Sequence, residues 1–138
     1  MIKLFKQGIM ATLIALLAIA PVRAEDPPPA GPSVTYTEMR PAFVVNYGGP
    51  GRLKYLKADI TLVTSSSDAT EAAEHHMPLI RNTLVTLLSS QTDEAVTTPV
   101  GQEQMRQDAT QAVKELFQQE VGHPVIDDLL FLNFIYQK

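Results

Sequence analysis

The sequence predicts an α+β fold in which two helices pack on one face of a small antiparallel-type sheet, in the order β-β-α-α-β. Between residues 68 and 119, apolar residues recur at steps of three and four in two runs, which is typical of amphipathic helices. The first run contains Ala73, Met77, Ile80, Leu84 and Leu87, and the second contains Met105, Ala109, Ala112 and Leu116. The apolar β-like runs at residues 42–63 and 125–136 are the segments able to cover both stripes.

The composition of the chain argues against several functional classes. A chain of 138 residues has room for one modest core, and a net charge of −4 provides no basic stripe for nucleic acid. The chain contains no cysteine, which removes disulfides, thiolate zinc sites and thiol nucleophiles. Neither a Gly-x-Ser-x-Gly nor a Ser-x-x-Lys pattern occurs. We therefore expect no enzyme activity and no cofactor.

Residues 1–24 have the layout of a secretory signal peptide or a short membrane anchor. Lys3 and Lys6 precede an uncharged apolar run at residues 8–20, and Ala24 supplies a small residue before the acidic Glu25. About 14 apolar residues span roughly 21 Å of helix, against about 30 Å of bilayer hydrocarbon, which favours cleavage between Ala24 and Glu25. A retained anchor is the alternative. Both interpretations put the rest of the chain outside the cytoplasm, because the two lysines keep their own end inside.

Residues 25–36 are predicted to be a proline-rich linker. The runs Pro27-Pro28-Pro29 and Gly31-Pro32 favour an extended polyproline conformation and cannot pair in a sheet. The folded domain is therefore expected at residues 37–138.

Two strands joined by a turn are predicted to open the domain. In residues 34–47, Phe43, Val45 and Tyr47 share one face, and Pro41 limits the first half to a sheet edge or a bulge. Residues 52–64 alternate, with Leu56, Ala58, Ile60 and Leu62 inward and Tyr55, Lys57, Asp59 and Thr61 outward. The glycine cluster at residues 48–51 is predicted to be a turn, because no Gly-Lys-Ser/Thr follows it as in a phosphate-binding loop.

The first helix is predicted to start at a capping box made by Asp68 and Glu71. Pro78 removes a backbone donor inside the apolar pattern, which predicts a kink or a restart near His76. We expect this helix to end near Ser89.

The second helix is predicted to start at Thr98-Pro99, with Gly101 in its first turn permitting close backbone packing. It is expected to run to about Glu120, where Gly122-His123-Pro124 stops it. The last segment, residues 125–136, is apolar on both faces, which predicts a central strand.

Few residues are candidates for chemistry or binding. Glu71 and His75 share a helix face at i and i+4, and with His123 they are the candidate ligands of a small metal-dependent hydrolase. Because this set lacks a fourth ligand, a solvated helix face with no metal is the favoured interpretation. Arg81 and Asn82 are the candidate partner-facing residues on the first helix, with an ordinary exposed polar face as the alternative.

Short motifs spread over residues 39–138 resemble the FliL family of flagellar basal-body-associated proteins. In chain order they are Phe43-Val44-Val45-Asn46, the Arg-x-x-Tyr-Leu of residues 52–56, Pro78-x-x-Arg81-Asn82, Leu87-Leu88-Ser89-Ser90, Thr98-x-x-Gly101 followed by Met105-Arg106, and Phe131-x-x-Phe134-x-x-Gln137. Each fragment is weak, and their order and spacing make the resemblance specific.

The resemblance implies a fold similar to the stomatin-like SPFH domain and a role in motility. Members of the family are typically single-pass inner-membrane proteins with a periplasmic domain. They associate with flagellar stator units built from MotA and MotB, in some cases as a homo-oligomeric ring. The short apolar run before Ala24 departs from the full-length membrane helix that the family usually has.

Two functional hypotheses from different classes follow. The first is a non-enzymatic basal-body protein that acts with the stator units at the periplasmic side of the inner membrane, or in the soluble periplasm if the N-terminus is cleaved. The alternative is a general periplasmic scaffold or envelope protein that has the same domain and no motor role.

Overall fold

The computed structural model describes residues 33–138 of the chain. The predicted cleavage site between Ala24 and Glu25, the whole of residues 1–24 and most of the predicted linker lie outside the described residues. Thr35 and Tyr36, at the end of that predicted linker, already belong to the first strand.

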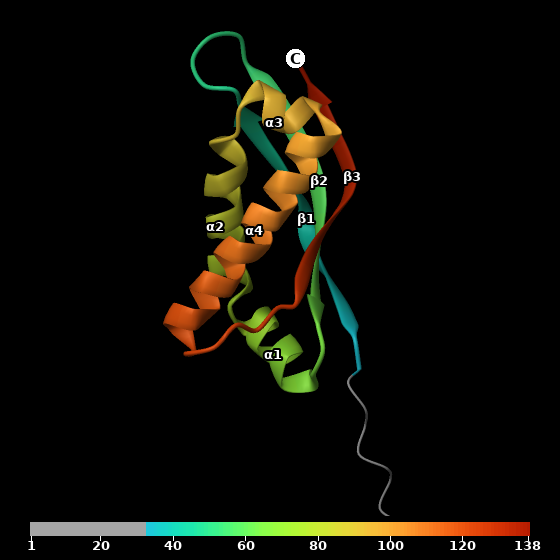
Figure 1. Cartoon of the computed structure of the whole chain (residues 1–138), viewed down its shortest axis with the longest axis vertical. Coiled ribbons are helices and arrows are strands. Elements are labelled where there is room, and N and C mark those ends of the chain that lie inside the picture. Colours follow the sequence, from blue (N-terminus) through green and yellow to red (C-terminus); the bar gives the residue numbers. More distant parts are fainter. Residues whose placement is uncertain (1–32) are drawn as a thin grey trace, which may run out of the picture.

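The fold is α+β, with a three-stranded antiparallel sheet and helices packed against it (Figure 1). In chain order the elements are β1 (Thr35–Tyr47), β2 (Lys54–Thr64), α1 (Ser67–His75), α2 (Met77–Ser89), α3 (Asp93–Thr97), α4 (Pro99–Glu120) and β3 (Asp128–Gln137). Where the sequence predicts two helices, the described chain has four. The first predicted helix is split into α1 and α2, and the short α3 precedes α4.

β3 is an edge strand, so the prediction of a central strand is wrong. The strand order is β1-β2-β3, and β2 is the strand with a neighbour on each side. The run is apolar on both faces for a different reason: one face of β3 meets the helices, and residues on the other face remain exposed. A bulge adds to this pattern, because the register with β2 shifts near Asn133, whose φ is 48°.

The predicted hairpin of β1 and β2 is confirmed, and so are its inward residues. Leu56, Ala58, Ile60 and Leu62 are completely buried, as are nearly all of the side chains of Phe43, Val45 and Tyr47. The predicted irregularity at Pro41 is a register shift between Met39 and Phe43. Thr61 points outward as predicted, yet it is only 5% exposed because Glu38 and Leu130 flank it on the two neighbouring strands.

The glycine-rich turn between β1 and β2 is also confirmed. Gly48, Gly49 and Gly51 all have positive φ, a region that other residues avoid. The Gly48 amide donates to the Gln91 carbonyl at 3.1 Å, which ties the turn to the end of the α2 segment.

The start of α1 differs from the prediction, and its end agrees. Ser66, and not Asp68, is the N-cap: its hydroxyl accepts a hydrogen bond from the Ala69 amide at 3.1 Å. Asp68 instead lies in the first turn, where its charge favours the helix dipole. The restart predicted near His76 is confirmed, because His76 ends α1 and precedes α2, with Pro78 in the first turn of α2.

The start of α4 agrees with the prediction. The Thr98 hydroxyl accepts from the Gly101 amide at 3.0 Å, and Pro99 is the first helical residue. A Cβ added at Gly101 would lie 2.6 Å from the Ala95 Cα and 2.6 Å from the Ala95 carbonyl oxygen. Glycine therefore permits the close contact between α3 and α4.

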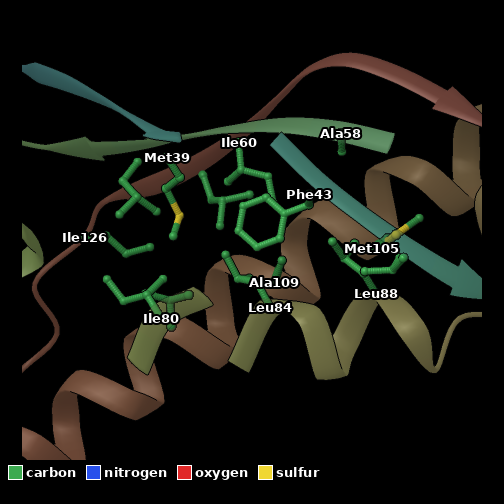
Figure 2. Packing of buried hydrophobic residues seen from close by; sticks show 14 of the residues in the cluster. Met39, Phe43, Ala58, Ile60, Ile80, Leu84, Leu88, Met105, Ala109 and Ile126 are labelled. Atoms are coloured by element: carbon green, nitrogen blue, oxygen red, sulfur yellow. The ribbon is translucent and has the colours of Figure 1, made fainter. Parts of the chain in front are cut away.

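The core lies between the sheet and the pair of helices α2 and α4, which cover the same face (Figure 1). Ile80, Leu84 and Leu88 from α2 meet Met39, Phe43 and Ile60 from the hairpin, with Met105 and Ala109 from α4 beside them (Figure 2). The buried stripe of α4 is partly different from the prediction: Val113 and Phe117 are fully buried, whereas Ala112 and Leu116 are half-buried. Met105 and Ala109 are buried as predicted, and only the second half of the expected stripe is one residue position away from the face that meets the sheet.

Candidate functional site

The face of the sheet that the helices leave uncovered is the most distinctive surface of the described chain. The registers bring outward residues of all three strands into rows, and one row consists of Val44, Lys57 and Ile135. We call this surface the open face and define it by the exposed apolar residues Tyr36, Val44, Tyr55, Leu132 and Ile135. Tyr36, Val44 and Ile135 are 64%, 65% and 58% exposed.

The open face also carries charges near its centre. Lys57 and Asp59 are two residues apart on β2 and therefore point to the same side. The Asp59 carboxylate accepts a hydrogen bond from the Asn133 amide at 2.8 Å, and Glu38 forms an ion pair with Arg40 at 2.7 Å. Exposed apolar residues around a small set of mixed charges suit contact with another protein.

The sequence alone does not reveal the open face. Both faces of β1 and β3 carry apolar residues, and which face is exposed depends on where the helices pack. One sequence pattern does point to such a face. A strand whose inward positions are already apolar carries a further apolar residue at an outward position, as Val44 and Ile135 do.

The two candidate partner-facing residues point in different directions. The Arg81 guanidinium donates to the Pro41 carbonyl and lies over the Phe43 ring, 4.2 Å from its centroid. This cation–π contact fastens α2 to the bulge of β1. Asn82 is exposed, and Val85 one turn further along α2 is exposed as well. Of the two candidates, Asn82 is thus the more exposed, whereas Arg81 is half-buried.

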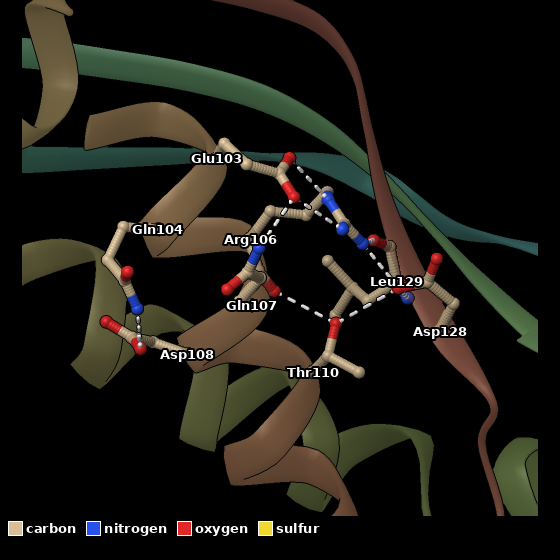
Figure 3. Close-up of polar contacts among 8 residues, drawn as sticks. All are labelled: Glu103, Gln104, Arg106, Gln107, Asp108, Thr110, Asp128 and Leu129. Carbon is tan, nitrogen blue, oxygen red and sulfur yellow. Dashed lines mark hydrogen bonds and ion pairs between the residues drawn. The ribbon is translucent and has the colours of Figure 1, made fainter. Parts of the chain in front are cut away.

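Arg106 joins α4 to the start of β3 (Figure 3). Its guanidinium binds both carboxylate oxygens of Glu103, at 2.9 and 2.7 Å, and also donates to the Asp128 carboxylate and to the Leu129 carbonyl at 3.1 Å. The hydroxyl of Thr110 donates to the Arg106 carbonyl at 2.9 Å. The two carboxylates raise the pKa of Arg106 above its usual range, and the hydrogen bond from Arg106 is the main reason that the pKa of Glu103 is lowered to about 2.

A second charged cluster lies at the other end of the sheet. Asp93 forms ion pairs with Lys54 at 3.1 Å and with Lys138 at 3.4 Å, and the bond from Lys54 lowers the pKa of the Asp93 carboxyl. The nearby Tyr47 hydroxyl is buried without a hydrogen-bond partner among residues 33–138, and this burial raises its pKa. The cluster connects the hairpin, α3 and the end of β3.

The candidate metal ligands do not come together. No group of three or more histidine, aspartate or glutamate side chains in residues 33–138 is arranged to hold a metal ion. Glu71 and His75 lie on α1, whereas His123 lies in the loop after α4, where its ring contacts the Pro124 carbonyl. His76 instead packs edge-on against Phe117, 5.6 Å between ring centroids.

Comparison with known families decides the relationship that the motifs imply. A family model described as flagellar basal body-associated protein FliL matches residues 36–137. The chain belongs to the FliL family. The match runs from β1 to the end of β3 and therefore covers the whole described fold. Membership makes the chain a flagellar basal-body-associated protein, and it confirms the resemblance predicted from the sequence.

A FliL-family relative agrees with this assignment. The chain is 26% identical over 100 residues to the "Flagellar protein FliL" of Aquifex aeolicus (strain VF5). The alignment covers 72% of this chain and 60% of the relative, so the chain spans less than two thirds of the relative's length. Among residues 33–138, no helix combines the length and hydropathy that crossing a membrane requires.

Several residues in the FliL-like motifs serve the fold. Arg81 fastens α2 to β1, Gly101 allows α3 to approach α4, and Arg106 holds the start of β3. Residues that stabilise the fold therefore carry much of the resemblance, and the motifs also include two residues of the open face, Val44 and Tyr55.

Proposed function

We propose that the protein is a non-enzymatic component of the flagellar basal body that acts with stator units of the MotA/MotB type in swimming and swarming. The observation that supports this most strongly is the FliL match over residues 36–137, which spans every helix and strand described. A family of basal-body-associated proteins supports a binding role in place of catalysis.

The proposal includes a location and a fold relationship. The domain acts on the periplasmic side of the inner membrane, held there by residues 1–24 if they are retained, or free in the periplasm if the chain is cut between Ala24 and Glu25. Its helices and sheet form a variant of the stomatin-like SPFH domain, and it works as a homo-oligomer.

The stator contact is proposed on the outer side of α2, around Asn82. Asn82 and Val85 are both exposed and lie on one side of the helix, which offers a polar group beside an apolar one. Arg81 supports this surface from below, because its bonds to β1 hold α2 in position.

The proposal is tested by deleting the gene and measuring swimming in media of increasing viscosity. We expect a motility defect that grows with viscous load, normal growth, and rescue by the unmodified gene. A chain carrying Asn82→Arg should fold, fail to rescue and lose co-purification with stator proteins. The matched control is Gln111→Arg, at an exposed position on α4, which should rescue fully.

The opposite result is equally informative. Unchanged motility under high load, together with co-purification of envelope proteins and no stator protein, would assign the chain to general envelope scaffolding and would contradict the motor role.

A further inference from the structure

No helix of residues 33–138 covers the open face of the sheet (Figure 1). Five of the large apolar residues that the fold exposes lie on this one face: Tyr36, Val44, Tyr55, Leu132 and Ile135. Removing such residues from water is favourable by about 25 cal/mol per Å². Lys57 and Asp59 lie among these apolar residues, and a mixed apolar and charged face of this kind suits association with another protein.

The charges on the open face are complementary to themselves. Lys57 and Asp59 flank Ala58, which points inward. If a second copy faces the first across a two-fold axis that runs parallel to the sheet between the two copies, crosses the strands and passes over Ala58, the two positions exchange. Lys57 of each copy then lies over Asp59 of the other. A two-fold axis along the strands would instead place Lys57 over Lys57, which is repulsive.

The same rotation also matches the apolar residues. Leu132 pairs with Asp59 in the sheet, and Ile135 pairs with Lys57. Exchange of these rows places Ile135 of one copy over Leu132 of the other. The charged pair thus lies at the centre with apolar contact beside it, the arrangement that excludes water from an interface.

We propose that two copies of this chain associate through their open faces as a reversible, two-fold symmetric sandwich of sheets. The area of the open face limits the affinity of the dimer. Three strands spaced about 4.8 Å apart, each about 33 Å long, present roughly 450 Å², whereas a stable interface covers about 800 Å² on each partner. The dimer is therefore a weak one that depends on concentration. This inference rests on the homo-oligomer in the proposed function and names its surface, but it does not rely on the motor role, because the stator contact is placed on α2.

The first test measures the mass of the full chain, as recovered from the cell envelope, by light scattering over a range of concentrations. We expect a shift from the mass of one chain, 15.2 kDa if residues 1–24 are retained and less if they are cleaved, toward twice that mass as concentration rises. Ile135→Glu should abolish the shift. Val100→Glu is the matched control, because Val100 is 82% exposed on α4, away from the open face, and this variant should dimerise normally.

A charge exchange tests the geometry independently. Lys57→Glu alone and Asp59→Lys alone should each weaken the dimer about tenfold, because each replaces two attractive pairs with repulsive ones. The double variant restores opposite charges and should recover most of the affinity. Circular dichroism spectra confirm that each variant is folded.

Three outcomes would overturn the proposal. They are a chain that stays monomeric at every concentration, a dimer that ignores Ile135→Glu, and a larger assembly whose size does not change with the charge exchange. The last two would assign self-association to another surface. A chain that stays monomeric would also contradict the homo-oligomer in the proposed function, whereas motility under load and co-purification with stator proteins test the motor role separately.

Discussion

Replacing Gly101 with alanine sets two effects of opposite sign against each other. Alanine is favoured over glycine inside a helix by about 1 kcal/mol, so helix propensity alone predicts that Gly101→Ala stabilises α4. The added Cβ would lie 2.6 Å from both the Cα and the carbonyl oxygen of Ala95, and 2.8 Å from the Glu94 carbonyl oxygen. Carbon atoms in contact are normally about 3.5–4.0 Å apart, so α3 and α4 must separate by about 1 Å.

The steric effect is expected to win. The obstructing atoms belong to the backbone of α3 and cannot rotate away as a flexible side chain would. Overpacking of this kind costs about 1–3 kcal/mol, and separation of the helices also lengthens the cap between the Gly101 amide and the Thr98 hydroxyl. Because the obstruction is backbone, the cost is expected in the upper part of this range, about 2–3 kcal/mol, and subtracting the gain of about 1 kcal/mol in propensity leaves a net loss of about 1–2 kcal/mol in the free energy of unfolding.

Urea titration followed by far-ultraviolet circular dichroism measures this change directly. Val100→Ala is the matched control: it alters the same first turn at an exposed position, and its effect should stay within about 0.5 kcal/mol. A Gly101→Ala variant as stable as the parent, or more stable, would refute the argument that the approach of α3 to α4 requires glycine.

Three further substitutions test the packing and charge of α4. Phe117→Ala removes a fully buried ring and should lower the free energy of unfolding by about 3–5 kcal/mol in urea titration. Arg106→Ala removes the link to Asp128 and Leu129 and should cost about 1–2 kcal/mol, seen as a lower Tm, with Arg106→Lys recovering only part. Glu103→Gln should make the free energy of unfolding depend less on pH in the acid range. Because the folded pKa of Glu103 is lowered to about 2, its contribution is complete above the ordinary value of 4.5 and is lost as pH falls toward 2, where parent and variant should converge.

Sequence reasoning recovered the features that depend on local chemistry. Alternation identified the inward side of β2 because residues two apart share a face regardless of what packs there. Thr98-Pro99 gave the start of α4, and Pro78 gave the break at His76, because capping and the missing proline donor act within one turn.

The errors concern features that depend on distant parts of the chain. An edge strand with an uncovered outer face and a central strand have the same apolar pattern, so β3 could not be placed from its residues alone. The buried stripe of α4 shifted to Val113 and Phe117 because the sheet, and not the helix, decides which side faces inward. The true cap of α1, Ser66, competes with an equally plausible Asp68 two residues later.

The candidate site was even less accessible from sequence. Arg81 and Asn82 are adjacent in one motif, yet one binds β1 and the other meets solvent. The distinction depends on the position of the Pro41 carbonyl, which only the folded bulge defines. The open face likewise exists only because both α2 and α4 pack on the opposite side.

The order in which the strands join the sheet has a consequence for how the chain folds. β1 and β2 are neighbours in sequence and can zip together early, whereas the third strand pairs across the length of the helical segment, Leu62 with Leu129. Non-local pairing of this kind slows folding, because the intervening chain must first be ordered. Until the helices pack, the hairpin exposes Leu56, Ile60 and Leu62 to any other nascent chain, and until β3 pairs, the edge of β2 is open as well. Folding in the cell should therefore depend on protection of this early hairpin, and a truncation that removes β3 should aggregate even though α1 to α4 remain present.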